Sequence, residues 1–262
     1  MGIVNKGVTV LHFDDTYQTQ RKLMSIPHDD IHLSNLKGTR LFCDSHSLKI
    51  IEKKLSYRKQ KGITLIGSGD FHYVTYLLLK EIKHPFDLIL FDHHTDLDDK
   101  AVQENMPISC GSWVSFALKD IPYLSKAILI GPKSCTAVNA AKKTLHIIPY
   151  EPENHQVIVR LLANMKNEPV YISIDKDVLK REEAITNWDQ GVMTVAALLF
   201  YLRIIRKETK VIGLDICGEA PKKMLSFATL ANRGISRNER INLKILKAFV
   251  NEHSLHETKH FA

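Results

Sequence analysis

The sequence predicts a three-layer α/β/α fold with a mainly parallel central sheet, formed by a single domain that spans residues 1–262. Three observations support this prediction. Short apolar runs recur along the chain without polar alternation, as buried parallel strands require. Amphipathic stretches of helical length separate these runs. No internal repeat, low-complexity segment or Pro/Gly/Ser-rich linker divides the chain into two parts.

The first half of the chain supplies most of the predicted strands. A strand at 7–13 (GVTVLHF) opens the series, and a second strand at 63–66 leads into a glycine-rich turn. Helical spacing follows at 72–82. Further apolar runs predict strands at 87–91 (DLILF), 127–130 (AILI) and 145–148.

The second half alternates helices with strands. A helix is expected at 154–165, a strand at 170–174 (VYISI), a strongly apolar helix at 195–205, a strand at 211–216 (VIGLDI) and a late helix at 241–250. In sheets of this kind, ligands bind beyond the carboxyl ends of the strands. Residues that carry chemistry should therefore lie where strands end.

The bulk composition limits the classes of partner. The chain has a formal net charge of +7, but its basic pairs, such as Lys53-Lys54 and Lys222-Lys223, are isolated and lack interleaved aromatic residues, so we expect no nucleic-acid partner. No apolar stretch reaches the roughly 18 residues of a membrane span, and no signal-peptide pattern opens the chain. The four cysteines are dispersed, which argues against a disulfide scaffold or a zinc-thiolate site. We expect a cytoplasmic protein without membrane association.

Two acidic motifs follow two of the predicted strands. The strand at 87–91 runs into Asp92-His93-His94-Thr95-Asp96, and the strand at 170–174 runs into Asp175-Lys176-Asp177. Alternate residues of extended backbone share one side, so the members of each motif can converge, and neighbouring strands would bring both motifs together. Carboxylates packed this closely repel one another unless cations neutralise them. Ligands that are mostly oxygen, with one or two imidazoles, suit Mn²⁺ better than zinc. The sequence therefore predicts two manganese ions at this edge.

These residues resemble the motifs of the ureohydrolase superfamily, the arginase and agmatinase group. The resemblance covers roughly residues 63–221 and includes a turn (Gly67-Ser68-Gly69-Asp70-Phe71-His72), the two acidic motifs with Ser173 before the second, and a late strand, Gly213-Leu214-Asp215-Ile216-Cys217-Gly218-Glu219-Ala220-Pro221. It implies an arginase-like fold and a binuclear manganese hydrolase. The implied reaction is attack of a metal-bridging hydroxide on a non-peptide C–N bond of a guanidino, amidino or formimino compound.

The resemblance also implies roles for individual residues. His72 and Asp96 would bind one manganese, His94 and Asp177 the other, and Asp92 and Asp175 would bridge them, with Asp70 as the alternative to His72 in the turn. Asp96 would contact the hydroxide, and Glu219 would face a cationic group of a small-molecule substrate. Glu104 stands where arginases have a proton-shuttling histidine. Members of the group often form homo-oligomers.

Other interpretations remain open from the sequence. The segment 187–191, with Trp188 and Asp189, is expected either to line the substrate pocket or to form a loop anchored by its tryptophan. The Asp-His-His sequence is also found in two-metal phosphoesterases of the DHH type, although there the Asp-x-Asp motif comes first. A catalytically inactive protein that retains the fold and the metals is the third alternative.

Overall fold

A computed structural model describes residues 7–133, 144–220 and 228–249 of the chain. Its centre is an eight-stranded sheet with the order β2-β1-β4-β10-β9-β5-β7-β8, and all of these neighbouring strands run parallel. In chain order the strands are β1 (Val8–His12), β2 (His28–His32), β4 (Ile63–Leu65), β5 (Phe86–Phe91), β7 (Leu124–Ile130), β8 (Thr144–Ile148), β9 (Pro169–Asp175) and β10 (Lys210–Cys217). A separate antiparallel pair joins β3 (Phe42–Cys43) to β6 (Ile108–Ser109).

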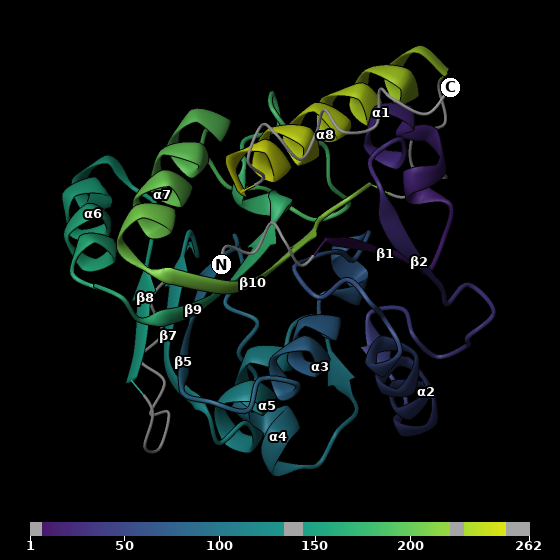
Figure 1. The fold of residues 1–262 in the computed structure, drawn as a ribbon, viewed down its shortest axis with the longest axis horizontal. Helices are drawn as coiled ribbons and strands as arrows, with labels where there is room; N and C mark the ends of the chain where they lie inside the picture. The colour runs from purple at the N-terminus through teal and green to yellow at the C-terminus, as the bar shows by residue number, and fades with distance from the viewer. Residues whose placement is uncertain (1–6, 134–143, 221–227, 250–262) are drawn as a thin grey trace.

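Helices cover both faces of the sheet (Figure 1). On one face lie α6 (His155–Ala163), α7 (Val195–Glu208) and α8 (Ala228–Phe249), with the short α1 (Arg21–Met24) beside α8. On the other lie α2 (Ser45–Ser56), α3 (Val74–Lys80), α4 (Asp99–Gln103) and α5 (Trp113–Asp120). The predicted three-layer α/β/α architecture with a mainly parallel sheet is confirmed.

Alternation along the central strands builds a hydrophobic core on each side of the sheet. In β5, Ile89 and Phe91 pack in the core that contains α6 and α7, whereas Leu88 and Leu90 pack in the core that contains α3 and α5. All four side chains are fully buried. Burial of each stabilises the fold by about 1.5–3 kcal/mol, and together they fix the register of the strand that ends at the acidic motif.

The structure agrees with the predicted strands and helices to within a few residues at most ends, and it adds elements that the sequence patterns did not indicate. The strand β2 (sequence HDDIH) lies at the edge of the sheet, and among its residues only Ile31 is buried, so it lacks an apolar run. Helices α2 and α5 were also not predicted. Helix α8 begins at Ala228, whereas the sequence predicted a start at 241. The prediction began too late because the first half of the helix carries few apolar residues. Residue 250 of the predicted helix lies outside the described residues.

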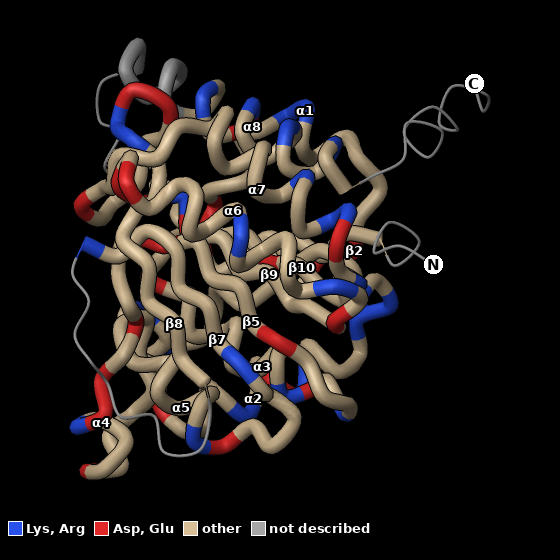
Figure 2. Tube along the Cα trace, turned by 90° about the vertical axis from the view of Figure 1, so that its left-hand side faces the viewer, with Lys and Arg blue, Asp and Glu red and all other residues tan. Residues whose placement is uncertain are grey.

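The described part of the chain contains no helix that is both long and apolar enough to cross a membrane. Figure 2 shows Lys and Arg interspersed with Asp and Glu on this side of the molecule, without a continuous stripe of one sign. The acidic residues Asp92, Asp175 and Asp177, by contrast, are buried. Acidic residues at the ends of the central strands are therefore a separate feature from the surface charge.

Candidate metal centre

Three neighbouring strands in the middle of the sheet position the candidate ligands. β10, β9 and β5 lie side by side, and the last residue of β10, Cys217, pairs with the last residue of β9, Asp175. Asp92 directly follows β5. His72 directly follows the single-turn helix η3 (Gly69–Phe71) beyond β4. The predicted adjacency of the two acidic strands is confirmed, and their carboxyl ends meet at one edge of the sheet.

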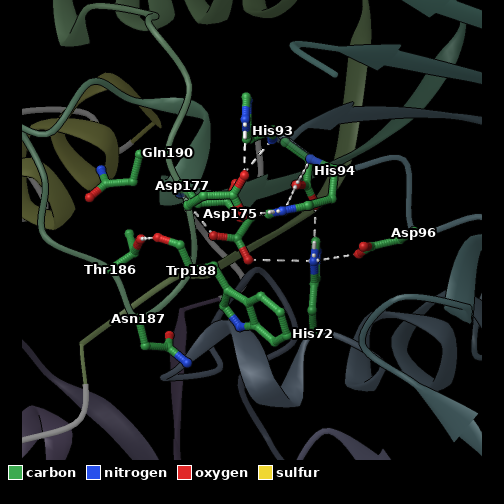
Figure 3. A network of polar contacts seen from close by, with 12 residues as sticks. His72, His93, His94, Asp96, Asp175, Asp177, Thr186, Asn187, Trp188 and Gln190 are labelled. Atoms are coloured by element: carbon green, nitrogen blue, oxygen red, sulfur yellow. Dashed lines mark hydrogen bonds and ion pairs between the residues drawn. The ribbon is translucent and has the colours of Figure 1, made fainter. Parts of the chain in front are cut away.

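Three carboxylates surround one nitrogen of His72. Its Nδ1 lies 3.3 Å from Asp92 Oδ2, 3.0 Å from Asp96 Oδ2 and 3.6 Å from Asp175 Oδ2. Figure 3 shows the His72 ring between Asp96 and Asp175. All four side chains are buried. His72, Asp92 and Asp96 offer donor atoms close enough to one another to hold a single metal ion.

A second group forms around His94, which is partly exposed. Its Nδ1 lies 2.8 Å from Asp177 Oδ2 and 3.6 Å from Asp92 Oδ1. Its Nε2 is 3.0 Å from Oδ1 of Asp189, at the rim. Asp92, His94 and Asp177 again bring their donor atoms within reach of one ion.

Asp92 belongs to both groups, because Oδ1 faces His94 while Oδ2 faces His72. Its Oδ2 is buried and has no hydrogen-bond partner among the described residues. An unpaired carboxylate oxygen is costly in the protein interior unless a cation binds it. Asp175 lies with His72 and Cys217 in a third overlapping group. The donor set, rich in carboxylate oxygen with one imidazole per group, fits two divalent cations.

Packing these carboxyl groups together shifts their pKa values. Burial and the neighbouring Asp92 raise the pKa of Asp96 to about 7. Burial and Asp175 raise the pKa of Asp177 well above its usual range. Burial also opposes ionisation of Asp92, but contacts with His72 and His94 outweigh it and lower the pKa of that carboxyl. Part of the cluster therefore holds protons that bound cations would displace.

A chain of hydrogen bonds behind His72 orients its ring. His72 Nε2 lies 2.9 Å from Ser173 Oγ, and this hydroxyl donates to Asp215 Oδ1 at 2.7 Å. Because the serine proton goes to Asp215, the hydroxyl accepts from Nε2–H, which leaves Nδ1 free to bind a metal. Sequence reasoning assigned no role to Ser173 or Asp215, although both lie in the motifs that carry the family resemblance.

The indole of Trp113 supports the other side of the same group. Its Nε1 donates to Asp96 Oδ2 at 2.6 Å, and its ring lies against His72. Asp96 itself adopts a left-handed backbone conformation with φ of 50°. The backbone at Asp96 therefore departs from an extended conformation, and the indole of Trp113 fixes the position of its carboxylate. No sequence pattern had indicated this contact.

The glycine-rich turn packs directly against the centre. A Cβ at Gly69 would lie 2.8 Å from Asp175 Oδ2 and 3.2 Å from Trp188 Cδ1, so the turn leaves no room for a side chain. Asp70 is buried but faces elsewhere: it pairs with Arg40 at 2.6 Å and accepts hydrogen bonds from Asn187 and Trp188. Of the two alternatives in this turn, the structure brings His72 to the acidic cluster.

A cavity of about 370 Å³ opens above the candidate ligands. The candidate ligands Asp92, His94, Asp96 and Asp177 line it. Its walls include His93, Cys110, Lys133, Trp188 and Asp189. The loop that carries Trp188 therefore borders the cavity, as one of the two interpretations of this segment expected.

Glu219 and Glu104, two residues expected to be catalytic, are not among the residues that line this cavity. Glu219 is buried, and its carboxylate pairs with Lys176 and accepts hydrogen bonds from Asn242, Asn238 and Gln20. It follows Gly218, whose φ of 81° turns the chain at the end of β10. Glu219 thus points into the protein, which does not fit the expectation that it faces a substrate.

Glu104 lies at the C-terminal end of α4, and its exposed side chain approaches Lys100 at 3.8 Å. An exposed pair of this kind leaves the carboxylate largely solvated. This position does not fit the expectation that Glu104 replaces a proton-shuttling histidine.

Comparisons with known proteins agree with the geometry. The model of the Arginase family matches residues 7–231. An uncharacterised protein of Thermotoga maritima is 33% identical over 92% of this chain and 88% of its own length. Agmatinase of Bacillus subtilis is 29% identical over 67% of this chain and 62% of its own length.

Solved structures share the fold at low sequence identity. Proclavaminate amidino hydrolase from Streptomyces clavuligerus superposes with a TM-score of 0.66 at 15% identity, covering 94% of this chain and 92% of that one. Formimidoylglutamase from Bacillus subtilis superposes with a TM-score of 0.64 at 17% identity, covering 92% and 86%.

Proposed function

The chain belongs to the arginase family, and on this basis we propose that it is a binuclear metal hydrolase that cleaves a non-peptide C–N bond of a guanidino, amidino or formimino compound. One observation carries the proposal: the buried Asp92 places one oxygen beside each of two histidines, and the oxygen beside His72 has no hydrogen-bond partner among the described residues. Relatives named agmatinase, amidino hydrolase and formimidoylglutamase support the substrate class.

Two divalent cations fit this cluster, and manganese is the metal that we propose from its oxygen-rich ligands. Residues His72, Asp96 and Asp175 would hold one ion, His94 and Asp177 the other, and Asp92 both. When bound, the pair would supply a nucleophile by lowering the pKa of a water molecule that the ions share.

The protein's own groups orient the ligands and handle protons. Ser173 holds the ring of His72 through Nε2, and Asp189 holds the ring of His94 in the same way. Burial and Asp92 raise the pKa of Asp96 to about 7 in the metal-free cluster, so its carboxyl would give up a proton as the cations bind. The indole of Trp113 keeps that carboxylate in place.

The indole of Trp188 offers a flat surface in the cavity wall. Its Nε1 donates to Asp70 Oδ1 at 3.1 Å, which fixes the ring. A planar amidinium or guanidinium cation binds well over such a face. We propose that Trp188 and Asp189 bind the substrate, in place of Glu219.

Metal analysis combined with a substrate screen tests this function. The purified protein, loaded with Mn²⁺ and dialysed, should retain about two ions per chain. It should release urea, ammonia or formamide from members of a panel of guanidino, amidino and formimino compounds. Asp92→Ala should lose both metal and turnover, while Glu153→Gln, which removes an exposed carboxylate, should lose neither.

Three outcomes would contradict the proposal. Retention of both ions and full turnover by Asp92→Ala would show that the shared carboxylate has no role. Hydrolysis of phosphodiesters but no amidine would indicate the phosphoesterase alternative, which the family match does not favour. Stoichiometric metal without turnover of any compound would indicate a protein that kept the centre and lost catalysis.

A further inference from the structure

A buried thiol lies beside the candidate centre, and no assignment so far includes it. Cys217 is the last residue of β10, and no part of its side chain reaches solvent. Its Sγ lies 3.1 Å from Asp175 Oδ2, the same oxygen that lies 3.6 Å from His72 Nδ1. The thiol therefore touches a carboxylate of the cluster on the side of His72.

We propose that Cys217 is a thiolate ligand of the ion that His72 and Asp175 hold, which makes the centre chemically asymmetric. The inference rests on the proposed metal centre but not on the identity of the substrate. As the ion binds, the S–H bond breaks, its proton leaves to solvent and the sulfur donates its electron pair to the metal. No oxidation or reduction occurs.

The distances fit ligands of one ion. A metal–sulfur bond is about 2.3 Å long and metal–nitrogen or metal–oxygen bonds are about 2.0–2.2 Å, so two donors of one ion cannot lie more than about 4.5 Å apart. The separations of 3.1 Å between sulfur and carboxylate and 3.6 Å between carboxylate and imidazole are both within this limit. His72, Asp175 and Cys217 form a compact, fully buried group of donors.

A second observation indicates a cation site at the same nitrogen of His72. Oδ2 of Asp92, 3.3 Å from His72 Nδ1, is buried without a hydrogen-bond partner among the described residues. Asp175 Oδ2, which the thiol contacts, lies at the same nitrogen of His72. A cation bound at this nitrogen would satisfy the unpaired Asp92 oxygen.

The backbone holds the sulfur in place. At Gly218, a Cβ would lie 2.3 Å from Asp175 Oδ1 and 2.6 Å from the backbone nitrogen of Lys176, so only glycine allows this close approach. The strand end that carries Cys217 is thereby pressed against the strand end that carries Asp175. The backbone of Cys217 is therefore held beside Asp175 by the pairing of β10 with β9.

The two metal positions would then differ in ligand chemistry. The group around His94 contains imidazole and carboxylate donors, whereas the group around His72 gains a soft sulfur donor. Thiolate favours zinc and other softer ions over Mn²⁺. We therefore expect both positions to bind Mn²⁺, but the His72 position to bind Zn²⁺ or Co²⁺ more tightly relative to Mn²⁺ than the oxygen-rich His94 position does.

Cobalt substitution tests the assignment directly. Co²⁺ bound to thiolate gives a sulfur-to-metal charge-transfer band in the near ultraviolet, whereas oxygen and nitrogen ligands do not. The four cysteines are replaced by serine one at a time, and each full-length variant is titrated with Co²⁺ under a phosphine reductant. Cys110 is the informative control, because it lines the cavity above the same centre; Cys43 is buried in an apolar core, and Cys135 lies outside the described residues.

We expect the band in the wild type, in Cys43→Ser, in Cys110→Ser and in Cys135→Ser, and its loss in Cys217→Ser. The ratio of Zn²⁺ to Mn²⁺ affinity should fall by about tenfold or more in Cys217→Ser. Circular dichroism spectra of Cys217→Ser and of a parallel Cys217→Ala variant should match the wild-type spectrum, which establishes that the fold is intact.

Specific results would overturn the assignment. Bound Co²⁺ without a charge-transfer band, a band that survives Cys217→Ser, or loss of the band in Cys110→Ser alone would each show that Cys217 only donates a hydrogen bond to Asp175. Those results would leave the proposed function standing. Failure of the wild type to bind any divalent ion would reject both.

Discussion

Replacing Glu219 by glutamine should destabilise the protein rather than weaken substrate binding. The carboxylate pairs with Lys176, whose side chain is fully buried, and Glu219 itself is 2% exposed. In Glu219→Gln, the Lys176 ammonium loses its counter-ion and keeps the side-chain oxygen of Asn242 at 3.1 Å. Removing one partner of a buried ion pair costs about 3–5 kcal/mol. That is a large part of the roughly 5–15 kcal/mol by which proteins are stable.

Urea unfolding followed by circular dichroism measures this cost. The double variant Lys176→Met/Glu219→Gln removes both charges and should recover about 1–3 kcal/mol relative to Glu219→Gln alone. As a matched control, Glu52→Gln breaks the pair with Lys80, in which both side chains are well exposed, and should cost about 0–1 kcal/mol.

The same variants decide between the two roles considered for Glu219. If Glu219 contacts the substrate, Glu219→Gln should raise KM by about tenfold or more and leave the free energy of unfolding within about 1 kcal/mol of the wild type. That combination would refute the structural role. A large loss of stability with little change in KM would agree with the buried contacts.

Three further predictions follow from the centre. Ser173→Ala removes the acceptor that fixes the His72 tautomer and should lower metal affinity by about 10–100-fold, measured by competition with a chelating dye; unchanged affinity would contradict the orienting role. Because the pKa of Asp96 is raised from 3.8 to about 7, its ionisation destabilises the metal-free fold as pH rises through that interval, whereas metal binding requires the ionised form. The rise in Tm on adding Mn²⁺ should therefore increase between about pH 5 and pH 8, and a decrease would be inconsistent with this carboxyl as a ligand. Trp188→Ala should raise KM by about tenfold with a smaller effect on kcat, because it removes a stacking face and none of the ligands; an unchanged KM would exclude the indole from substrate binding.

The parts of the site that could be predicted from sequence are those set by local periodicity. Asp175 ends one apolar strand and Asp92 directly follows its neighbour, so both carboxylates lie at one edge of the sheet. The residues after them do not continue in extended backbone, as had been expected: Lys176–Val178 form a single-turn helix and Asp96 has a φ of 50°. Lys176, between two acidic residues in the sequence, pairs with Glu219. These results require only that neighbouring strands end at the same edge of the sheet.

The parts that could not be predicted depend on contacts between distant segments. The direction of Glu219 is set by the positive φ of Gly218 and by partners from α8, which no local pattern reveals. The contact of Trp113 with Asp96 joins a helix to a loop. The strand β2 was missed because an edge strand needs few apolar residues.

The internal pairing of Glu219 also has a consequence for substrate selection. A carboxylate that already neutralises Lys176 and accepts hydrogen bonds from three amides has no free lone pair for a substrate cation. Under the proposed function, recognition would then come from the cavity wall, where segment 187–191 supplies Trp188 and Asp189.

That segment is firmly held rather than loose. The side chains of Asn187 and Trp188 donate to Asp70, the Gln190 amide donates to two backbone carbonyls, and the backbone N–H of Gly191 donates to the carbonyl of Asp177. At Gly191, a Cβ would lie 2.6 Å from the carbonyl oxygen of Val178, so the loop packs directly on the turn after β9 that carries the candidate ligand Asp177. Under the proposed function, a wall fixed to this turn would hold the substrate at a constant position relative to the ions, which is what orientation of a planar carbon for attack requires. We therefore expect substrate preference to follow the sequence of this loop, and the proposed ligands below it to determine the chemistry.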